Sequence, residues 1–303
     1  NKKKYIENTT LDPIKFTKVI NNLILRKVNN IILEASSHGL KQNRLDGLLF
    51  DIGIFTNLSH DHLDYHGNME RYFNAKKILF DQLSNNEVKN KAVAVINFDD
   101  DWGRKLVHYL SNKKVKTVTY GLANGADYRA VDLRLTKTSI EFAIEVGSRK
   151  FKSSIPLVGR FNIYNALAAL ASCAAVGLNV RETVNNLKQL PQIPGRLESV
   201  SSGRAFEVFV DYAHTPDALE KTLLSIKELD PRRIILVFGC GGERDLEKRA
   251  KMGDVASRFS NYSIITSDNP RSEDPMEIIK GIESGFGGSH YEILEDRREA
   301  IAK

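Results

Sequence analysis

Apolar runs and amphipathic stretches alternate along the first part of the chain. Short runs bounded by polar residues predict buried strands, at residues 31–33, 52–58, 92–97 and 115–120. Residues 69–83 predict a helix, because apolar side chains recur there every three or four positions. This alternation favours a mostly parallel sheet with helices on its faces. Between Tyr128 and Leu157 the period becomes two, which predicts antiparallel hairpins in an appended or edge sheet.

The second half of the chain shows a similar alternation. Residues 161–176 and 180–190 predict two helices, and Pro191-Gln-Ile-Pro-Gly195 then breaks the pattern twice. We therefore expect two domains, at residues 1–193 and 194–303. Beyond the break, predicted strands and helices alternate, at 207–210, 217–229, 234–238, 247–259, 262–266 and 276–283. The expected fold class is α/β, with a mostly parallel central sheet, a small antiparallel sheet and a second, Rossmann-like α/β domain.

Lys76 interrupts the apolar stripe of the helix predicted at residues 69–83. It lies four and three positions after Tyr72 and Phe73, and three and four positions before Leu79 and Phe80. Burial lowers the pKa of an ammonium group, so an inward lysine either pairs with anions or becomes a reactive neutral amine. A neutral amine can capture carbon dioxide as a carbamate, which could hold a divalent cation. The alternative is a lysine whose stem covers apolar surface while its head reaches water.

Histidines and acids are concentrated in the segment 56–67, which follows a predicted strand. Open α/β sheets bind ligands at the carboxyl ends of their strands, so this segment is a candidate metal site. Glu34 ends the strand predicted at 31–33 and could bind Mg²⁺, which prefers oxygen ligands. Two alternatives stay open. One is a hydrogen-bonded polar loop with Glu34 as a turn or cap residue, and the other is a hydrolase-type zinc cluster, although Tyr65 spoils its spacing.

Length and composition narrow the classes of protein. The 303 residues suggest about two domains. The net charge of +6 suits an anionic small-molecule substrate as well as a nucleic acid. Two distant cysteines, Cys173 and Cys240, give no disulfide framework, and no apolar run approaches a membrane span. We expect a cytoplasmic monomer that binds neither nucleic acid nor membrane, since basic residues are not interleaved with aromatic ones.

Several multi-residue motifs occur in an order that resembles the Mur ligase family. They are Glu34-Ala-Ser-Ser-His-Gly39, Thr56-Asn-Leu-Ser-His-Asp-His-Leu-Asp-Tyr-His-Gly67, Ala75-Lys-Lys-Ile-Leu-Phe80, Gly159-Arg-Phe-Asn-Ile-Tyr-Asn-Ala166, Gly195-Arg-Leu-Glu198, Asp211-Tyr-Ala-His-Thr-Pro-Asp217 and Asp268-Asn-Pro-Arg271. The resemblance implies ATP-dependent ligation of an amino acid to UDP-N-acetylmuramoyl-L-alanyl-D-glutamate, by way of an acyl phosphate. ATP and Mg²⁺ are the implied cofactors, because cations must bridge phosphate and carboxylate oxygens that otherwise repel each other.

The resemblance also implies roles for individual residues. Lys76 matches the carbamylated lysine of the family, and Glu34 and His62 match ligands of a magnesium ion. The residues matched to the nucleotide-sugar peptide are Asn8, Thr9, Ser36 and Arg44. The residues matched to ATP are Asn162 and Asn165 near the adenine, Arg196 near the phosphates, Asp211 at the ribose, and His214 of the same motif.

The amino-acid substrate is suggested by Asp268-Asn-Pro-Arg271, which resembles the signature of family members that add meso-diaminopimelate. A guanidinium can pair with the second carboxylate of that diamino acid, which lysine lacks. Arg271, together with Asp268, Asn269 and Arg244, would bind it. Lysine-adding ligases and folylpolyglutamate synthetases are the enzymatic alternatives. A binding piece without turnover is an alternative of another class.

The Gly-Lys-Thr sequence on which the family holds ATP phosphates does not occur in the 303 residues. In the family it precedes the region matched by Glu7-Asn-Thr-Thr10, and a uridine-nucleotide domain precedes it in turn. Further amino-acid contacts of the family would follow Lys303. We therefore expect the sequence to be an internal piece of a longer ligase, with little ligase activity by itself.

Overall fold

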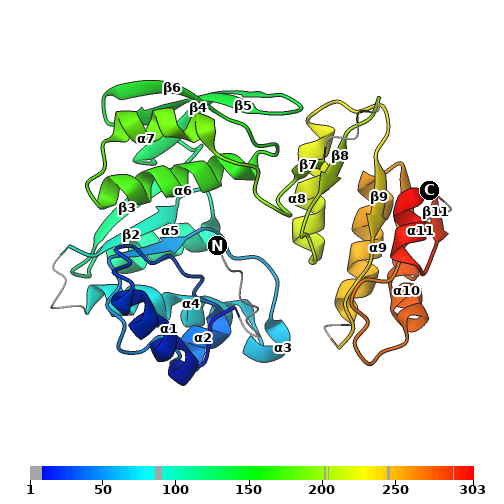
Figure 1. Cartoon of the computed structure of the whole chain (residues 1–303), viewed down its shortest axis with the longest axis horizontal. Coiled ribbons are helices and arrows are strands. Elements are labelled where there is room, and N and C mark those ends of the chain that lie inside the picture. Colours follow the sequence, from blue (N-terminus) through cyan, green and yellow to red (C-terminus); the bar gives the residue numbers. More distant parts are fainter. Residues whose placement is uncertain (1–8, 86–90, 201–202, 204, 244–245, 289) are drawn as a thin grey trace. The chain divides into compact units, whose positions relative to one another are not determined.

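The computed structural model describes residues 9–85, 91–200, 203, 205–243, 246–288 and 290–303 (Figure 1). The chain forms two compact units that interleave along the sequence. Residues 1–129 and 167–180 form the first unit, and residues 130–166 and 181–303 form the second. The boundary expected between residues 193 and 194 stays a prediction.

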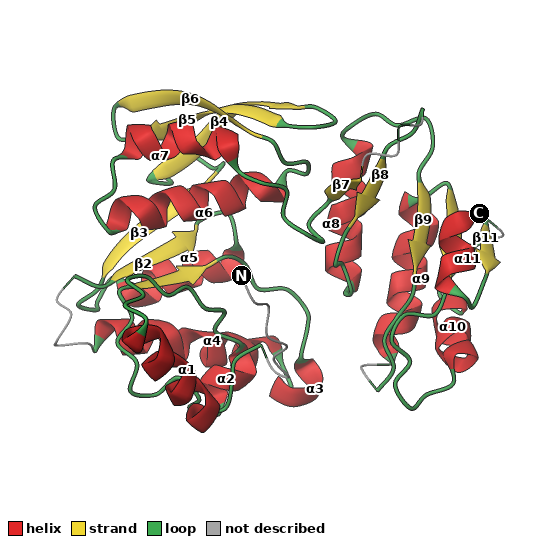
Figure 2. Ribbon diagram, in the orientation of Figure 1, coloured by secondary structure: helices red, strands yellow, loops and turns green. Residues whose placement is uncertain are grey.

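Six strands form the larger sheet, in the spatial order β1-β2-β3-β4-β5-β6 (Figure 2). The strands are β1 (Ile52–Phe55), β2 (Val93–Asn97), β3 (Lys116–Gly121), β4 (Tyr128–Leu135), β5 (Ile140–Val146) and β6 (Arg149–Ile155). Strands β1 to β4 pair in parallel, whereas β5 and β6 form an antiparallel hairpin. The period-two segment therefore lies at the edge of the main sheet, as its alternation predicts.

The first unit places helix α4 (Met69–Ser84) against the sheet, where Tyr72, Phe73, Phe80 and Leu83 are buried. Every residue of β2 is buried, as expected for a strand covered on both faces. The close approach of α4 to β1 needs a glycine: a Cβ at Gly53 would lie 2.5 Å from Leu83 Cδ1. The remaining helices of the unit are α1 (Pro13–Leu25), α2 (Ser37–Lys41), α3 (Leu63–His66) and α5 (Asp101–Leu110). The helix expected at 69–83 is confirmed.

Residues 31–33 are not a strand, which corrects the sequence-based expectation. The segment has no regular secondary structure, and the Ile32 side chain is 96% exposed. An apolar run predicts burial, but a strand also requires a neighbouring strand to receive its backbone hydrogen bonds. Within the described residues the sheet begins at β1, and none of its strands pairs with residues 31–33. Likewise β1 ends at Phe55, three residues before the predicted end at Leu58.

The second unit contains a parallel three-stranded sheet in the order β11-β10-β9 and an antiparallel pair, β7 with β8. These strands are β7 (Glu198–Val200), β8 (Val208–Val210), β9 (Ile235–Phe238), β10 (Tyr262–Ile265) and β11 (Tyr291–Ile293). The helices are α7 (Val180–Asn186), a short 3₁₀ helix (Leu187–Gln189), α8 (Pro216–Lys227), α9 (Glu247–Phe259), α10 (Pro275–Glu283) and α11 (Arg297–Ala302), while α6 (Phe161–Ala175) has residues in both units. The expected α/β fold class is confirmed. Among the described residues, no helix combines the length and hydrophobicity that a membrane crossing requires.

Candidate active site

Lys76 lies on α4 among buried residues of the first unit, and its side chain is half-buried. Desolvation lowers the pKa of the Lys76 ammonium group, and the nearby carboxylates of Glu34 and Asp61 oppose that effect. Its Nζ atom lies 5.9 Å from the centroid of the Tyr72 ring. The amine of Lys76 therefore loses its proton more readily than a lysine in water does. The neutral amine left by that loss is the form that reacts with carbon dioxide.

The groups near Lys76 fit a magnesium ion in their chemistry. Glu34 offers an exposed carboxylate, and a carbamate on Lys76 would add further oxygen donors. His62 precedes α3 in a left-handed backbone conformation, with φ of 55°. Among the described residues, no three His, Cys, Asp or Glu side chains are already grouped as ligands of one metal. The predicted ligands are Glu34, His62 and a carbamylated Lys76. A carbamylated lysine is not among the four residue types of such a group.

Two side chains hold the loop that carries Asp61 and His62: Asn97 is the last residue of β2, and Asp100 is the N-cap residue of α5. The Asn97 side-chain amide donates to the backbone carbonyl of Thr56 at 2.7 Å. The Asp100 carboxylate accepts a hydrogen bond from the backbone N–H of Leu58 at 3.3 Å. Within the loop, Asp61 accepts from the backbone N–H of His62 at 3.0 Å. These contacts place the loop at the carboxyl end of the parallel strands, where α/β sheets bind ligands.

The histidines after β1 pack against other rings. His38 lies 4.9 Å from His62 and 4.1 Å from Tyr65, measured between ring centroids. His66 is buried, stacks on Tyr72 at 5.0 Å, and its Nε2 lies 2.9 Å from the Ser37 hydroxyl oxygen. Desolvation of the buried ring is the largest cause that lowers the pKa of His66, and neighbouring basic groups add to the effect. The loop and α2 are thereby joined through side chains.

Thr10 connects the described residues that the sequence assigned to the nucleotide-sugar peptide. Its hydroxyl donates to the Glu34 carbonyl at 2.9 Å and accepts from the Ser36 backbone N–H at 3.0 Å. Its own carbonyl accepts a hydrogen bond from Arg44 Nη1 at 2.7 Å. Ser36 caps α2, and Thr9 is exposed beside this group. Thr9, Ser36 and Arg44 are therefore brought together, whereas Asn8 lies outside the described residues.

The residues assigned to ATP lie in the second unit, and several hydrogen-bond to the protein itself. The buried Asn162 amide donates to the Val158 carbonyl at 2.7 Å and accepts from Asn165 at 3.0 Å, while the Asn165 side chain is exposed. The Asp211 carboxylate accepts hydrogen bonds from three groups, namely the backbone N–H of Leu197, the backbone N–H of Ala213 and the Thr222 hydroxyl.

The exposed ring of Tyr212 contacts two residues assigned to ATP. These are Arg196, which precedes Tyr212 in the sequence, and His214, which follows it. The Arg196 guanidinium carbon is 5.9 Å from the ring centroid, and the His214 ring is 5.0 Å away in an edge arrangement. The Tyr212 backbone N–H donates to the Gly195 carbonyl at 2.8 Å. The residues assigned to the phosphates and to the ribose thus lie beside the antiparallel pair β7 and β8. Thr215 is the N-cap residue of α8.

The residues assigned to the amino-acid substrate follow β10. Asp268 lies 3.7 Å from Arg297 Nη1 in an exposed ion pair, and the Asn269 carbonyl accepts from the Gly242 backbone N–H at 2.9 Å. Arg271 is exposed and has a left-handed backbone, with φ of 55°. Arg244, the other arginine assigned to this substrate, lies outside the described residues.

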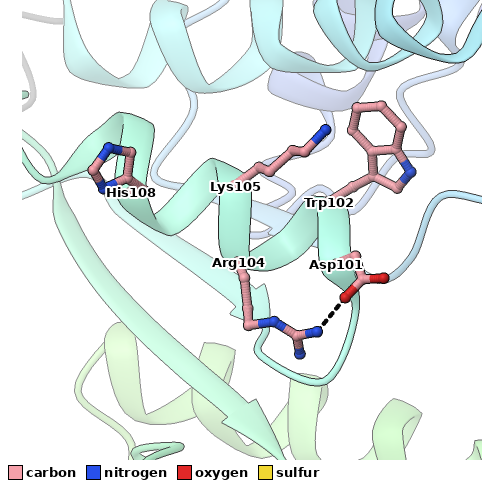
Figure 3. A pocket seen from close by; sticks show the side chains of 5 residues that line it. All are labelled: Asp101, Trp102, Arg104, Lys105 and His108. Atoms are coloured by element: carbon pink, nitrogen blue, oxygen red, sulfur yellow. Dashed lines mark hydrogen bonds and ion pairs between the residues drawn. The ribbon is translucent and has the colours of Figure 1, made fainter.

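A hollow on the surface of α5 contains none of the predicted site residues (Figure 3). It is lined by Asp101, Trp102, Arg104, Lys105 and His108. Asp101 and Arg104 form an ion pair, and Lys105 Nζ lies 3.9 Å from the centroid of the Trp102 ring while also contacting Glu70 at 3.0 Å. Its charged side chains are thus paired with other residues of the protein.

Sequence reasoning missed residues whose partners are distant along the chain. Asn97 and Asp100 contact residues about 40 positions earlier, and a local pattern carries no signal for such contacts. Asp61 could have been found, because an acid directly before a metal-ligand candidate is a natural electrostatic partner. Thr10 was also missed. The motif assigned its neighbour Thr9 to the substrate, whereas Thr10 is the buried threonine of the two.

Two family descriptions match this chain. The Mur ligase middle domain matches residues 1–173, and the Mur ligase glutamate ligase domain matches residues 195–303. A curated UDP-N-acetylmuramoyl-L-alanyl-D-glutamate–2,6-diaminopimelate ligase 1 from Clostridium acetobutylicum is 40% identical over 305 residues, covering 100% of this chain and 61% of the relative. The corresponding ligase of Halalkalibacterium halodurans is 41% identical over 300 residues, covering 99% of this chain and 61% of the relative.

Solved structures give the same picture at the level of fold. A structure of a UDP-N-acetylmuramoyl-L-alanyl-D-glutamate–2,6-diaminopimelate ligase has a TM-score of 0.66 and 37% identity, over 97% of this chain and 60% of that one. The folylpolyglutamate synthase of Mycobacterium tuberculosis, complexed with ADP and AMPPCP, has a TM-score of 0.69 but 20% identity, over 83% and 56%, and shares the fold alone. The chain spans about three fifths of the length of these curated relatives. The match of its middle domain over more than half of the residues establishes that this chain belongs to the Mur ligase family.

Proposed function

We propose that the natural protein is an ATP-dependent ligase that joins meso-diaminopimelate to UDP-N-acetylmuramoyl-L-alanyl-D-glutamate in peptidoglycan precursor synthesis. The observation that carries this reaction class is the half-buried amine of Lys76, with its lowered pKa and its two carboxylate neighbours, Glu34 and Asp61. Diaminopimelate ligases with 40% and 41% identity support the choice of substrates.

In this proposal the first unit prepares the acid substrate. The neutral Lys76 amine adds to carbon dioxide and releases one proton, which leaves a carbamate anion on the side chain. The carbamate, Glu34 and His62 would hold Mg²⁺, which when bound offsets the repulsion between phosphate and carboxylate oxygens. Thr9, Ser36 and Arg44 would bind the nucleotide-sugar peptide, since the Arg44 guanidinium suits a phosphate or carboxylate. Asn8 is assigned to the same substrate from the sequence alone.

The second unit would contribute nucleotide and amino-acid contacts. Asn162 shapes the start of α6. The exposed side chain of Asn165, held by its hydrogen bond to Asn162, would face an adenine. Arg196 would pair with phosphate, Asp211 would lie at the ribose, and His214 of the same motif would also contact the nucleotide. Arg271, with Asp268, Asn269 and Arg244, would bind the diamino acid, and the Arg271 guanidinium would pair with the carboxylate that lysine lacks. The glutamate carboxylate of the acceptor attacks the γ-phosphate of ATP, which forms an acyl phosphate and releases ADP. The amine of the bound diamino acid then attacks the acyl carbon and loses a proton, and inorganic phosphate leaves as the amide bond forms.

Release of phosphate by the natural protein tests this proposal. It should require the dipeptide acceptor and meso-diaminopimelate together, and Lys76→Ala should lower it by about 10²-fold or more. Lys77→Ala is the matched control, because Lys77 is the next residue on α4 and its Nζ lies over the Tyr109 ring at 4.1 Å. Added short-chain carboxylic acids should partly restore Lys76→Ala by replacing the carbamate. Phosphate release that ignores both substrates, or that survives Lys76→Ala, would contradict the proposal.

The monomeric state and the cytoplasmic location stay predictions. Cys173 and Cys240 are free cysteines in the structure. We also infer that residues 1–303 alone turn over slowly, because their sequence lacks the Gly-Lys-Thr phosphate-binding motif. Comparing residues 1–303 with the natural protein in the same phosphate assay tests that inference.

A further inference from the structure

An ion pair in the second unit joins the buried Arg249 to the partly exposed Glu273, which lies two residues after Arg271. Arg249 belongs to α9 and is 6% exposed. Its Nη2 atom donates to both carboxylate oxygens of Glu273, at 2.9 Å and 2.7 Å. The Arg249 stem is covered by α10, since a Cβ at Gly281 would lie 3.0 Å from Arg249 Cδ. This guanidinium is therefore withdrawn from solvent and is not itself available to an anionic substrate.

Glu273 closes the turn that begins at Pro270. Its backbone N–H donates to the Pro270 carbonyl at 3.0 Å, so the turn encloses Arg271 and Ser272. Its carboxylate also accepts a hydrogen bond from the backbone N–H of Glu243, and the Ser272 hydroxyl donates to the Glu243 carboxylate. One side chain thus joins α9, the loop after β9 and the turn after β10.

Arg271 needs this support because of its backbone conformation. A residue other than glycine with a φ of 55° is uncommon, and it persists when the surrounding structure holds it. Its Nη1 atom lies 3.5 Å from the Glu243 carbonyl, and Glu243 has a positive φ of 53° as well. Arg271 and Glu243, both with positive φ, therefore face each other. The Glu273 carboxylate accepts from the backbone of Glu243, and Glu273 lies two residues after Arg271.

An ion pair that buries a guanidinium is a weak source of net stability, because desolvation of the buried charge offsets the attraction. Its best-attested use is to specify one geometry among several. We propose that Arg249 and Glu273 are positioning residues for the amino-acid substrate, whose ion pair fixes the turn 270–273 and thereby the direction of the Arg271 guanidinium. This inference rests on the proposed function, in which Arg271 pairs with the second carboxylate of the diamino acid.

Two conservative variants of the natural protein test the proposal. Arg249→Lys keeps the charge but loses the two-fold contact, and Glu273→Gln keeps the shape but loses the charge. Both should raise KM for meso-diaminopimelate about tenfold or more, because small displacements of a binding group are costly. KM for ATP and for the dipeptide acceptor should stay within about twofold, and preference for diaminopimelate over lysine should fall. Arg258→Lys is the matched control, since Arg258 lies on the same helix in an exposed pair with Asp254.

A double-mutant cycle separates positioning from general stability. In an Arg271→Ala background, Glu273→Gln should add little to the loss of diaminopimelate selectivity, because the group it positions is already gone. An equal additional loss in that background, or a uniform change in all three KM values, would overturn the proposal. If a single variant does not fold, Arg249→Met combined with Glu273→Leu replaces the pair with apolar side chains of similar size. That protein should fold and show the same selective rise in KM, and unchanged selectivity in it would equally overturn the proposal. Failure of the proposed function is distinct, because the unaltered protein would then not use diaminopimelate.

Discussion

The side-chain amide of Asn97 and the backbone carbonyl of Thr56 are joined by a hydrogen bond of 2.7 Å, across 41 residues of sequence. Asn97 is the last residue of β2, and Thr56 is the first residue after β1. This bond fixes the start of the loop that presents Asp61 and His62 beside α4. The Asn97 side-chain oxygen also accepts from the Asp99 backbone N–H at 3.0 Å, so a single buried side chain organises two loops.

Asn97→Asp should destabilise the protein by about 1–3 kcal/mol, because the carboxylate keeps the acceptor for Asp99 but places negative charge against the Thr56 carbonyl. Urea denaturation measures the difference. Asn57→Asp is the control, since Asn57 is exposed on the same loop, and its effect should stay within about 0.5 kcal/mol. Equal effects of the two substitutions would show that the bond to Thr56 does not hold the loop.

Gly242→Ala should disrupt the contact between the loop after β9 and the turn of Arg271. A Cβ at Gly242 would lie 2.0 Å from the Pro270 carbonyl oxygen, and backbone atoms cannot yield as the end of a flexible side chain can. We expect a raised KM for the amino-acid substrate and a lower unfolding temperature. Gly241→Ala is the matched control, because its Cβ would meet Asn269 at an ordinary 3.6 Å. If the two variants behave alike, close backbone approach at Gly242 is not the constraint.

The two cysteines should differ in reactivity. Burial raises the pKa of the Cys240 thiol from 9.0 to about 11, whereas Cys173 is partly exposed. Iodoacetamide at pH 8 should therefore label Cys173 well before Cys240, because the thiolate is the reactive form and access is needed. Mass spectrometry of the modified peptides measures this, and protein unfolded in urea should show comparable labelling of both. Faster labelling of Cys240 in the folded protein would contradict its burial.

The same shift predicts a dependence of stability on pH. The folded-state pKa of Cys240 is the higher one, so the unfolded chain loses that proton first as the pH rises. The contribution of Cys240 is fully present below pH 9.0 and is lost as the pH rises towards about 11. The difference in stability between the protein and Cys240→Ala should therefore change over that interval and stay constant below it.

Arg271→Ala should impair use of meso-diaminopimelate and spare use of lysine. Loss of one charge-assisted contact corresponds to a rise in KM of about 10- to 100-fold. Arg298→Ala is the control, because Arg298 is exposed on α11. Parallel measurements of KM for the two amino acids decide the question. An equal loss for both would show that Arg271 does not distinguish them by the second carboxylate.

The sequence predicts those parts of the fold whose pattern is local. The helix at 69–83 is predictable because its apolar residues form one stripe along an amphipathic helix. Lys76 stands out because it interrupts that stripe. Residues 31–33 were assigned wrongly because apolar character cannot say whether a partner strand is present. The support of the site was missed for a related reason. Contacts such as Arg249 with Glu273 join residues 24 positions apart, and only the folded chain reveals them.

The proposed chemistry begins with uptake of carbon dioxide by the Lys76 amine. Carbon-13 NMR of the protein equilibrated with ¹³C-labelled bicarbonate near pH 8 detects the carbamate itself. We expect a carbamate signal in the unaltered protein that is retained in Lys77→Arg and lost in Lys76→Arg. Absence of the signal in the unaltered protein, or its survival in Lys76→Arg, would show that Lys76 is not carbamylated.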